Sequence, residues 1–422
     1  MRKVLILVAL WSCACIVLTS CSWAADTLSI RQAVSLAREF HPNMKSAAAA
    51  LSASRGEFWT AISPPPPTVG VEYEGVPKGL NPDRYAERRM GINQELEFPL
   101  KYLWRGTRAR SEINRARAES RAILLDIEMA VRLEYVETWA TAERVRLLEE
   151  SAILAETYAQ QSKRREELGE IAPLEARRAQ VEALQVRREL ERERRNHQAA
   201  VARLTRLTGR DLKDVILVAP MASAIIDTLA IPVEVALEGN PELIGLEAEL
   251  RSVKNSLTLA SLSWLPDLEV GYFQQRIPAE SDPDFWGLEV GFSLPVWFWL
   301  GGRGDIQTVK AQKRTATAAM QTRRLEIFSE WDTQRQEYIS GLEQVRIFND
   351  EILPLARESY DLARRSFDLG EANYLEVLDA QRSLLQTQLV HLESLTALYN
   401  SRIKLDRLAG RSLITYENGR DK

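Results

Sequence analysis

The sequence predicts a mainly α-helical protein with a small β part, built from a duplicated unit of long antiparallel helical hairpins and strand pairs. Long proline-free stretches with apolar residues at helical spacing predict the helices. Four short segments with alternating apolar and polar residues predict the strands. Motifs that recur about 200 residues apart predict the duplication.

The duplication appears when the chain is compared with itself. Four motifs of the first half recur in the second in the same order: His41-Pro42 with Asn240-Pro241, Phe98-Pro99 with Leu294-Pro295, Leu168-Gly169-Glu170 with Leu369-Gly370-Glu371, and Arg206-Leu207-Thr208-Gly209-Arg210 with Arg407-Leu408-Ala409-Gly410-Arg411. A period this long indicates a duplicated half rather than a solenoid. We therefore expect repeats over 28–210 and 231–412, a linker over 211–230 and a C-terminal tail over 413–422.

Each repeat is predicted to contain one pair of very long helices. The pairs are expected over 100–167 and 173–208, and over 303–368 and 374–409. At about 1.5 Å per residue the first helix would extend on the order of 100 Å. Leucines at seven-residue spacing, Leu378, Leu385 and Leu392, indicate that the last helix packs along another helix.

The strands are expected over 68–75, 89–98, 267–274 and 285–294. A period of two places apolar side chains on one face and acidic or small residues on the other, with Gln94 as an exception on the apolar face. An antiparallel sheet over a soluble core would show the same alternation. The aromatic run Val296-Trp297-Phe298-Trp299 after the fourth strand is typical of a membrane interface, or of packing at a helix junction.

The N-terminus has the pattern of an export signal. Arg2 and Lys3 precede an apolar run, so residues 1–20 are expected to be removed. Leu18-Thr19-Ser20-Cys21 resembles a lipobox, which makes Cys21 the candidate lipidation site, whereas Trp23-Ala24-Ala25 would suit ordinary cleavage near Ala25. All three cysteines lie in this segment, so no internal disulfide is expected in the mature chain.

Export and alternation together favour an outer-membrane barrel over a soluble sheet. Four strands cannot close a barrel, and unpaired strand edges are costly in lipid. The missing strands must then come from sister chains. Two copies would make eight strands with a filled interior, whereas three would make twelve and leave a passage, which favours a homotrimer.

Six strand-region acids are predicted to line the barrel lumen, with no strand lysine or arginine to offset them: Glu72, Glu74, Glu95, Glu97, Glu269 and Glu289. A lumen ringed with carboxylates concentrates cations and repels anions. The residues thus predict a cation preference rather than a binding site.

Several functional classes are excluded by composition and motifs. The formal net charge of −4 offers no basic surface for nucleic acid. No catalytic constellation or phosphate loop is visible, so we expect no enzyme and no cofactor. The three histidines are scattered and predict no metal site. The charged segment 189–195 is interpreted as a solvated helical face.

The duplicated order of elements, with Leu-Gly-Glu at both helical tips and Leu375-Glu376-Val377-Leu378-Asp379-Ala380-Gln381 after the second, resembles the TolC family of outer-membrane factors. The resemblance covers residues 28–412. It implies a trimer with a twelve-stranded barrel in the outer-membrane lipid and a long periplasmic α-barrel tunnel. It also implies two partners, a periplasmic adaptor protein and an inner-membrane pump.

The resemblance also carries site residues. It implies adaptor contacts at the helical tips through Arg165, Leu168, Gly169, Glu170, Arg365, Leu369, Gly370 and Glu371. Glu376 and Asp379 match two acids that line the constricted tunnel entrance in relatives, where Glu376 replaces the more usual aspartate. Alternatively, both are exposed acids stabilised by the helix dipole.

The substrate prediction comes from a shorter motif. Glu95-Leu96-Glu97-Phe98-Pro99 resembles the heavy-metal (cobalt, zinc, cadmium) branch, which serves pumps of the resistance-nodulation-division class. Leu100-Lys101-Tyr102 stands where that branch has Gly-Lys-Arg. A protein-secretion conduit of the same fold and a soluble periplasmic coiled-coil scaffold are the alternatives.

Overall fold

The computed structural model describes residues 27–76, 85–213, 215–220, 233–278, 284–369, 371–372 and 374–414. The predicted export signal, the candidate lipidation site Cys21 and the tip residue Gly370 lie outside these residues. Among the described residues, no helix combines the length and the apolar character needed to cross a membrane.

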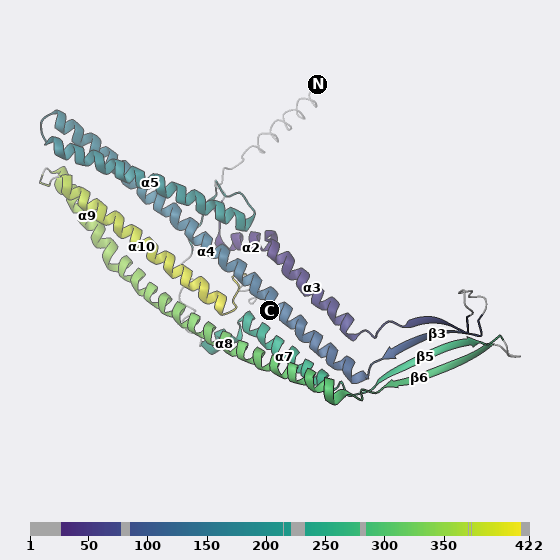
Figure 1. Ribbon diagram of the computed structural model, residues 1–422. Coiled ribbons are helices and arrows are strands. Elements are labelled where there is room, and N and C mark those ends of the chain that lie inside the picture. The colour runs from purple at the N-terminus through teal and green to yellow at the C-terminus, as the bar shows by residue number, and fades with distance from the viewer. Residues whose placement is uncertain are drawn as a thin grey trace, which may run out of the picture. The chain divides into compact units, whose positions relative to one another are not determined.

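The protein is mainly α-helical with a small β part, as predicted (Figure 1). The first repeat contains β1 (Thr27–Leu28), α2 (Ile30–Phe40), α3 (Pro42–Ile62), β2 (Thr68–Glu74), β3 (Glu87–Leu96), α4 (Pro99–Glu167) and α5 (Pro173–Thr208). The short strand β4 (Ile216–Leu217) lies in the predicted linker. The second repeat contains α6 (Val233–Glu238), α7 (Pro241–Ser261), β5 (Asp267–Arg276), β6 (Asp284–Ser293), α8 (Phe298–Ile347), α9 (Leu353–Asp368) and α10 (Tyr374–Leu408).

The chain divides into two compact units that do not follow the sequence repeats. The first unit takes its described residues from the ranges 1–40, 131–224 and 343–399, and the second from 41–130, 225–342 and 400–422. Each unit therefore combines parts of both repeats. The two long hairpins of helices meet in the first unit, which also holds the short strands β1 and β4, and the four longer strands β2, β3, β5 and β6 meet in the second.

Helix starts in the second unit preserve the duplication. The His41 ring nitrogen Nδ1 accepts a hydrogen bond from the backbone N–H of Asn43 at 3.3 Å. The Asn240 side chain accepts from the backbone N–H of Glu242 at 2.9 Å and donates to the carbonyl oxygen of Leu408. Both helices have proline at the first turn, where its missing N–H breaks no helical hydrogen bond.

The C-terminal ends of α5 and α10 also preserve the duplication. Gly209 ends α5 with φ +70°, and Gly410 follows α10 with φ +67°, a left-handed conformation that favours glycine. A Cβ at Gly410 would lie 1.9 Å from the carbonyl oxygen of Gly239, so only glycine fits there. The recurring Leu-x-Gly-Arg motif is thus a pair of helix terminators.

In the first unit, Tyr135 fixes the two shortest strands. β1 and β4 pair in parallel, with Thr27 opposite Ile216. The Tyr135 side chain is fully buried, and its hydroxyl lies 2.7 Å from the carbonyl oxygens of both Leu28 and Val218. Burial raises the pKa of Tyr135 to about 12, so the hydroxyl stays protonated.

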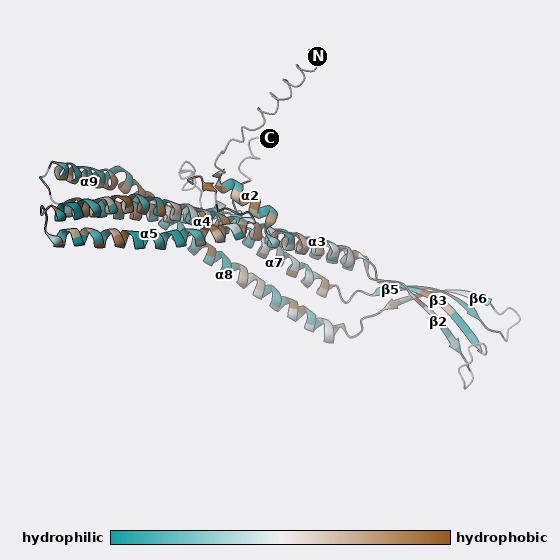
Figure 2. Cartoon of the chain, turned by 90° about the horizontal axis from the view of Figure 1, so that it is seen from above, coloured by the Kyte–Doolittle hydropathy of each residue, from teal (hydrophilic) through white to brown (hydrophobic). Residues whose placement is uncertain are grey.

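An aromatic and aliphatic core joins the hairpin α4–α5 to the hairpin α9–α10. The Tyr158 ring lies 5.4 Å from the Tyr374 ring and 6.2 Å from the Phe367 ring, between centroids. Small residues let the helices approach, and Val377 is fully buried beside this group. By contrast α5 is largely hydrophilic along its length (Figure 2).

The second hairpin differs from the single helix expected over 303–368. Its first helix begins earlier, at Phe298, and a π-helical segment Phe348–Ile352 separates α8 from α9. Pro354 follows this segment. Proline lacks an N–H and its ring clashes with the carbonyl four residues back, and the wider turn accommodates both.

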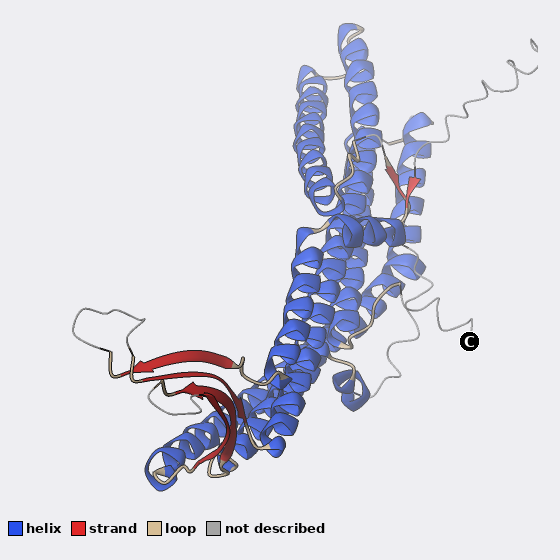
Figure 3. Cartoon of the chain, turned by 90° about the vertical axis from the view of Figure 1, so that its right-hand side faces the viewer, coloured by secondary structure: helices blue, strands red, loops and turns tan. Residues whose placement is uncertain are grey.

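The strands of the second unit form one antiparallel sheet in the order β2-β3-β5-β6. The central pair β3–β5 joins the two repeats. The sheet is visibly curved (Figure 3). β2 and β6 form the two edges of the described sheet.

A partly buried charge network connects four helices of the second unit. Glu242 in α7 accepts from Arg323 in α8 at 2.7 Å and from Arg407 in α10 at 2.8 Å. Arg407 also pairs with Asp126 in α4. Burial opposes ionisation of Glu242, but the two arginines outweigh it and lower its pKa.

We expect Glu242→Gln to destabilise the fold at pH 7 by about 1–3 kcal/mol, because a charged acceptor is lost from a buried network. Because the pKa of Glu242 is lower in the folded protein, its ionised form stabilises the fold at pH values above its unfolded-state pKa near 4.3. This stabilisation is lost as the pH falls through the folded-state pKa. Thermal unfolding of both proteins by circular dichroism from pH 7 to 3 should show the difference shrinking below about pH 4.3. Glu326→Gln, at an exposed partner of Arg323, is the control. A difference that does not change with pH would contradict this assignment.

Candidate functional site

The strand registers divide the sheet of the second unit into a polar and an apolar face. Directly paired residues of antiparallel strands point to the same face. The polar face carries Thr68, Gly70, Glu72, Glu74, Glu87, Arg89, Gly91, Asn93, Glu95, Asp267, Glu269, Gly271, Phe273, Gln275, Phe285, Gly287, Glu289, Gly291 and Ser293. It combines acids with all five strand glycines.

Five of the six acids predicted to line a lumen share this face, namely Glu72, Glu74, Glu95, Glu269 and Glu289. Glu97 does not, because β3 ends at Leu96. The Glu97 carboxylate instead pairs with Arg105 in the first turns of α4. Its assignment to the strand face is therefore corrected, and it belongs to the strand–helix junction.

The expectation that no basic residue offsets these acids is also wrong. Arg89 lies on the polar face, directly opposite Glu72. Its guanidinium lies 3.7 Å from the centroid of the Phe273 ring and 2.7 Å from a Glu289 carboxylate oxygen. Counting by twos along the strand from Glu95 reaches Arg89, so the alternation contained this signal.

Glycines make room for the Phe273 ring. Phe273 is paired with Gly91 on one side and Gly287 on the other. A Cβ at Gly287 would lie 2.3 Å from the tip of the Phe273 ring. The tip of the ring thus lies close to the Gly287 backbone, and the Arg89 guanidinium lies over the ring, an arrangement that favours a cation–π contact.

The apolar face consists of exposed large side chains. Trp286 is 74% exposed and Val69 is 75% exposed, although both are hydrophobic. Met90, Ile92, Tyr272, Leu288, Val290 and Phe292 are exposed on the same face. Beyond β6, Trp297 and Trp299 are also exposed. A contiguous exposed apolar surface of this kind indicates contact with lipid or another chain.

A largely buried ion pair joins the sheet to the helices. The Lys101 ammonium lies 2.8 Å from the Asp267 carboxylate, and both side chains are mostly buried. Asp267 also accepts from the backbone N–H of Phe98 at 2.9 Å. This contact joins the start of α4 to the start of β5, and therefore the first repeat to the second.

The two helical tips end with related backbone hydrogen bonds. The N–H of Glu170 donates to the Arg165 carbonyl at 2.8 Å, and the N–H of Glu371 donates to the Ser366 carbonyl at 2.8 Å. Gly169 has φ +74° at the first tip. Leu168 is 74% exposed and its counterpart Leu369 is 75% exposed, so each tip presents a leucine to its surroundings.

Between the tips, α4, α5, α9 and α10 enclose a cavity of about 390 Å³. The predicted tip residues Arg165 and Glu371 and the predicted entrance residue Glu376 line it, together with Tyr158, Phe367 and Tyr374. Arg165 pairs with Glu170 at 3.1 Å and lies 5.9 Å from the Phe367 ring. Leu369 is positioned by its backbone N–H, which donates to the carbonyl of Arg365.

The two candidate entrance acids lie one turn apart near the start of α10. Both are exposed, and the Asp379 carboxylate lies 3.8 Å from Arg382. Arg382 also makes a two-pronged contact with the buried Glu182 of α5. Glu376 lies in the first helical turn, where the helix dipole favours a negative charge.

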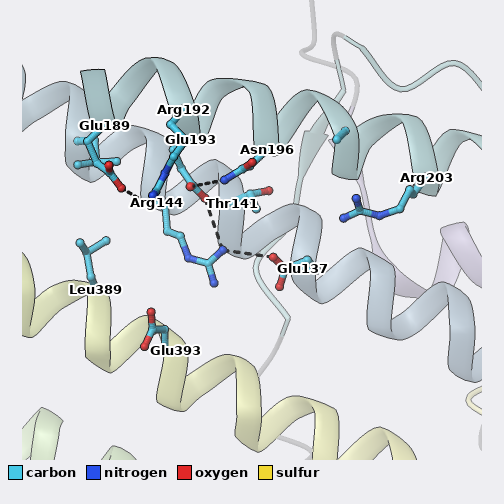
Figure 4. A pocket seen from close by; sticks show the side chains of 12 residues that line it. Glu137, Thr141, Arg144, Glu189, Arg192, Glu193, Asn196, Arg203, Leu389 and Glu393 are labelled. Atoms are coloured by element: carbon cyan, nitrogen blue, oxygen red, sulfur yellow. Dashed lines mark hydrogen bonds and ion pairs between the residues drawn. The ribbon is translucent and has the colours of Figure 1, made fainter. Parts of the chain in front are cut away.

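A second cavity, of about 480 Å³, was not predicted (Figure 4). It lies among α4, α5 and α10, and its centre is Arg144, which lies 3.2 Å from Glu137 and 3.5 Å from the buried Glu193. Glu193 falls in the segment interpreted as a solvated face, so that interpretation holds for its exposed neighbours only. Sequence spacing gave no signal for this cavity, because its walls come from three helices far apart in the chain.

The described residues contain no group of three or more His, Cys, Asp or Glu arranged to hold a metal ion. His197 lies 3.1 Å from the Thr141 hydroxyl, and burial lowers its pKa. His391 contacts the ring of Phe348, and burial together with Arg357 lowers its pKa. Both histidines are therefore neutral packing residues at pH 7.

Comparison with known proteins decides the family. The family model described as "Outer membrane efflux protein" matches residues 33–210 and 233–411. The chain belongs to the outer membrane efflux protein family. It is 26% identical over 402 residues to the cobalt-zinc-cadmium resistance protein CzcC of Cupriavidus metallidurans, covering 92% of this chain and 91% of that protein.

Solved structures agree in fold. CusC has a TM-score of 0.77 at 15% identity, covering 91% of this chain and 92% of the other. The outer-membrane channel OprN has a TM-score of 0.76 at 17% identity, covering 91% and 90%. The protein is therefore an outer-membrane efflux channel, a transport conduit and not an enzyme, with long periplasmic helices and strands that contribute to a β-barrel.

Proposed function

We propose that three copies of this chain form a twelve-stranded barrel continuous with a helical tunnel, and that the assembly exports heavy-metal cations. A periplasmic adaptor and an inner-membrane pump of the resistance-nodulation-division class would supply the substrate and the energy. The observation that carries this proposal is the acidic face of the sheet. A protein-secretion conduit would have the same fold. The negative charge of the polar face favours cations as the substrate instead.

The polar face carries seven acidic residues and one basic residue, Arg89. In a closed barrel with the apolar face toward lipid, this face lines the lumen. A low-dielectric wall focuses the field of such carboxylates and raises the local concentration of cations. Oxygen donors suit divalent cations, and scattered single carboxylates would let them pass without trapping them.

The edges of the sheet support a shared barrel. β2 and β6 each present backbone groups that no other described strand of the same chain pairs. In lipid these groups must find partners, and a neighbouring copy supplies them when β6 of one chain meets β2 of the next. Three copies of four strands leave a lumen wide enough for hydrated ions.

Two similarities support heavy-metal cations within this class. One is the relative CzcC, a cobalt-zinc-cadmium resistance protein that aligns with nearly the whole chain. The other is the motif at 95–99, which resembles the heavy-metal branch. Leu100-Lys101-Tyr102 departs from that branch at its first and third positions but keeps the lysine, and Lys101 pairs with Asp267 here.

The test of the proposal is the reversal potential of the purified protein in a planar bilayer with a salt gradient, beside native mass analysis. We expect a trimer and stable cation-selective channels. Replacing Glu72, Glu95, Glu269 and Glu289 by glutamine should lower the cation-to-anion permeability ratio several-fold, since the wall charge is removed. Arg89→Gln should raise the ratio roughly twofold. Anion selectivity of the wild-type protein, or ratios unaffected by all five changes, would overturn the cation proposal.

The exposed leucines of the tips are proposed adaptor contacts, together with Arg165, Gly169, Glu170, Arg365, Gly370 and Glu371. We expect Leu168→Ser with Leu369→Ser to weaken adaptor binding about tenfold or more, because two apolar anchors are lost from the contact. Affinity for the cognate adaptor is measured by surface plasmon resonance. Ile153→Ser, at another exposed apolar residue of α4 away from the tip, is the control. Equal losses in the test and control proteins would count against tip docking.

Glu376 and Asp379 are proposed to narrow the tunnel entrance. Three copies would place six carboxylates around it, and their removal should widen it and reduce its affinity for cations. We expect Glu376→Ala with Asp379→Ala to raise single-channel conductance about twofold and to abolish block by millimolar divalent cations. Glu371→Ala is the matched control at the tip. Unchanged conductance and block in the double variant would refute the entrance assignment.

A further inference from the structure

The apolar face of the sheet ends in a charged row. The registers align its residues in five cross-strand rows, and the last row before the hairpin turns is Tyr73, Arg88, Arg276 and Asp284. This row lies at the end of the sheet opposite to the ends that join α3, α4, α7 and α8. The rows nearer the helices contain aliphatic and aromatic side chains with two glutamines, Gln94 and Gln274.

Two like charges face each other in this row. Arg88 and Arg276 are direct cross-strand partners, an arrangement that is destabilising when nothing lies between the charges. The Arg276 guanidinium lies 3.9 Å from Asp284, at the outer limit of an ion pair. The Arg88 guanidinium lies 5.9 Å from the Tyr85 ring, and no carboxylate of the described residues forms an ion pair with it. The row therefore has a net positive charge among the described residues.

A cavity of about 180 Å³ opens beside the two guanidinium groups. Its lining is mostly polar and includes one apolar residue, Met90; the polar residues are Arg88, Gln274, Gln275, Arg276 and Asp284. Planar guanidinium groups bind the oxygens of a phosphate in a two-pronged manner, and the Gln274 amide can donate as well. The cavity thus combines donors for an anion with one apolar residue of the lipid-facing surface.

The height of the row matches a lipid headgroup. Successive rows are two residues apart, or about 6.8 Å along a strand. The charged row is four rows beyond Leu96, Leu268 and Phe292, so it lies about 27 Å further along the strands. With strands tilted by 35–45° this is about 20 Å across the membrane, close to the ~25 Å apolar band of such barrels. The helices are periplasmic, so the row lies at the outer surface.

We infer that Arg88 and Arg276 bind the phosphate group of a phosphorylated lipid in the outer leaflet of the outer membrane. The lipid phosphate separates the two guanidinium charges, and the acyl chains lie along the apolar rows beneath. This inference rests on the proposed barrel, in which the apolar face meets lipid. It assigns a ligand to residues that have no part in transport through the lumen.

The experiment measures binding of bisphosphorylated lipid A to the detergent-solubilised wild-type protein by native mass spectrometry, with dephosphorylated lipid A and inorganic pyrophosphate as the other probes. We expect Arg88→Gln with Arg276→Gln to weaken binding of the phosphorylated lipid about tenfold or more. Dephosphorylated lipid A should bind both proteins equally. The double variant with lysine at both positions keeps the charge and should retain intermediate affinity.

Arg89→Gln is the matched control, because Arg89 is the neighbour of Arg88 on the opposite face. It should leave lipid affinity unchanged and alter ion selectivity, whereas the Arg88 and Arg276 variant should conduct like the wild type. Unchanged lipid affinity in that variant, lipid binding independent of the phosphates, or pyrophosphate binding as tight as the lipid would overturn the inference. Failure of the wild-type protein to form channels would instead refute the proposed function.

Discussion

The rest of the structure depends on the hydrogen bonding of one pair of strands. β3 and β5 come from different repeats, and their pairing over nine residue pairs makes one sheet from two separate hairpins. Lys101 and Asp267 hold the same two repeats together where the strands join the helices. Because backbone groups cannot remain unpaired in lipid, this sheet fixes which edges are left for neighbouring copies. Duplication thus supplies both the width of the sheet and its two open edges.

Several carboxylates share the polar face of the sheet, and their cross-strand neighbours determine how strongly they repel one another. In the β5–β6 pair, Glu269 is opposite Gly291 and Glu289 is opposite Gly271. In the pairs with β3, two acids do face each other, Glu269 with Glu95 and Glu74 with Glu87. Like charges that face each other directly are destabilising, and the glycines of β5–β6 limit such opposition to the two pairs that involve β3. Where acids are adjacent to Arg89, the guanidinium supplies the compensation. Two other glycines, Gly91 and Gly287, clear the space that the Phe273 ring occupies.

Much of this fold could be predicted from the sequence, because its main elements follow simple periods. The helix over 173–208 and the strand parity are local patterns, and glycine and proline mark their ends. The π-helical segment near Pro354, the pairing of β1 with β4 and the cavity around Arg144 depend on contacts between distant helices. Glu97 was misplaced by two residues of strand length, which is the usual uncertainty at an element boundary. Arg89 was missed although the alternation predicts its face.

Arg88 and Arg89 illustrate what strand geometry does with adjacent residues of one type. In the sequence, Arg88 and Arg89 are adjacent positive charges, a pattern that suggests a single basic patch. A period of two sends one to the acidic face, where Phe273 and Glu289 hold it, and the other to the end of the apolar face, opposite Arg276. A guanidinium held by an aromatic ring and a carboxylate is already satisfied, whereas two opposed guanidiniums are stabilised by an anion between them. Arginine therefore has a structural role at position 89, on the polar face, and binds a ligand at position 88, on the apolar face. Only the strand register distinguishes the two positions.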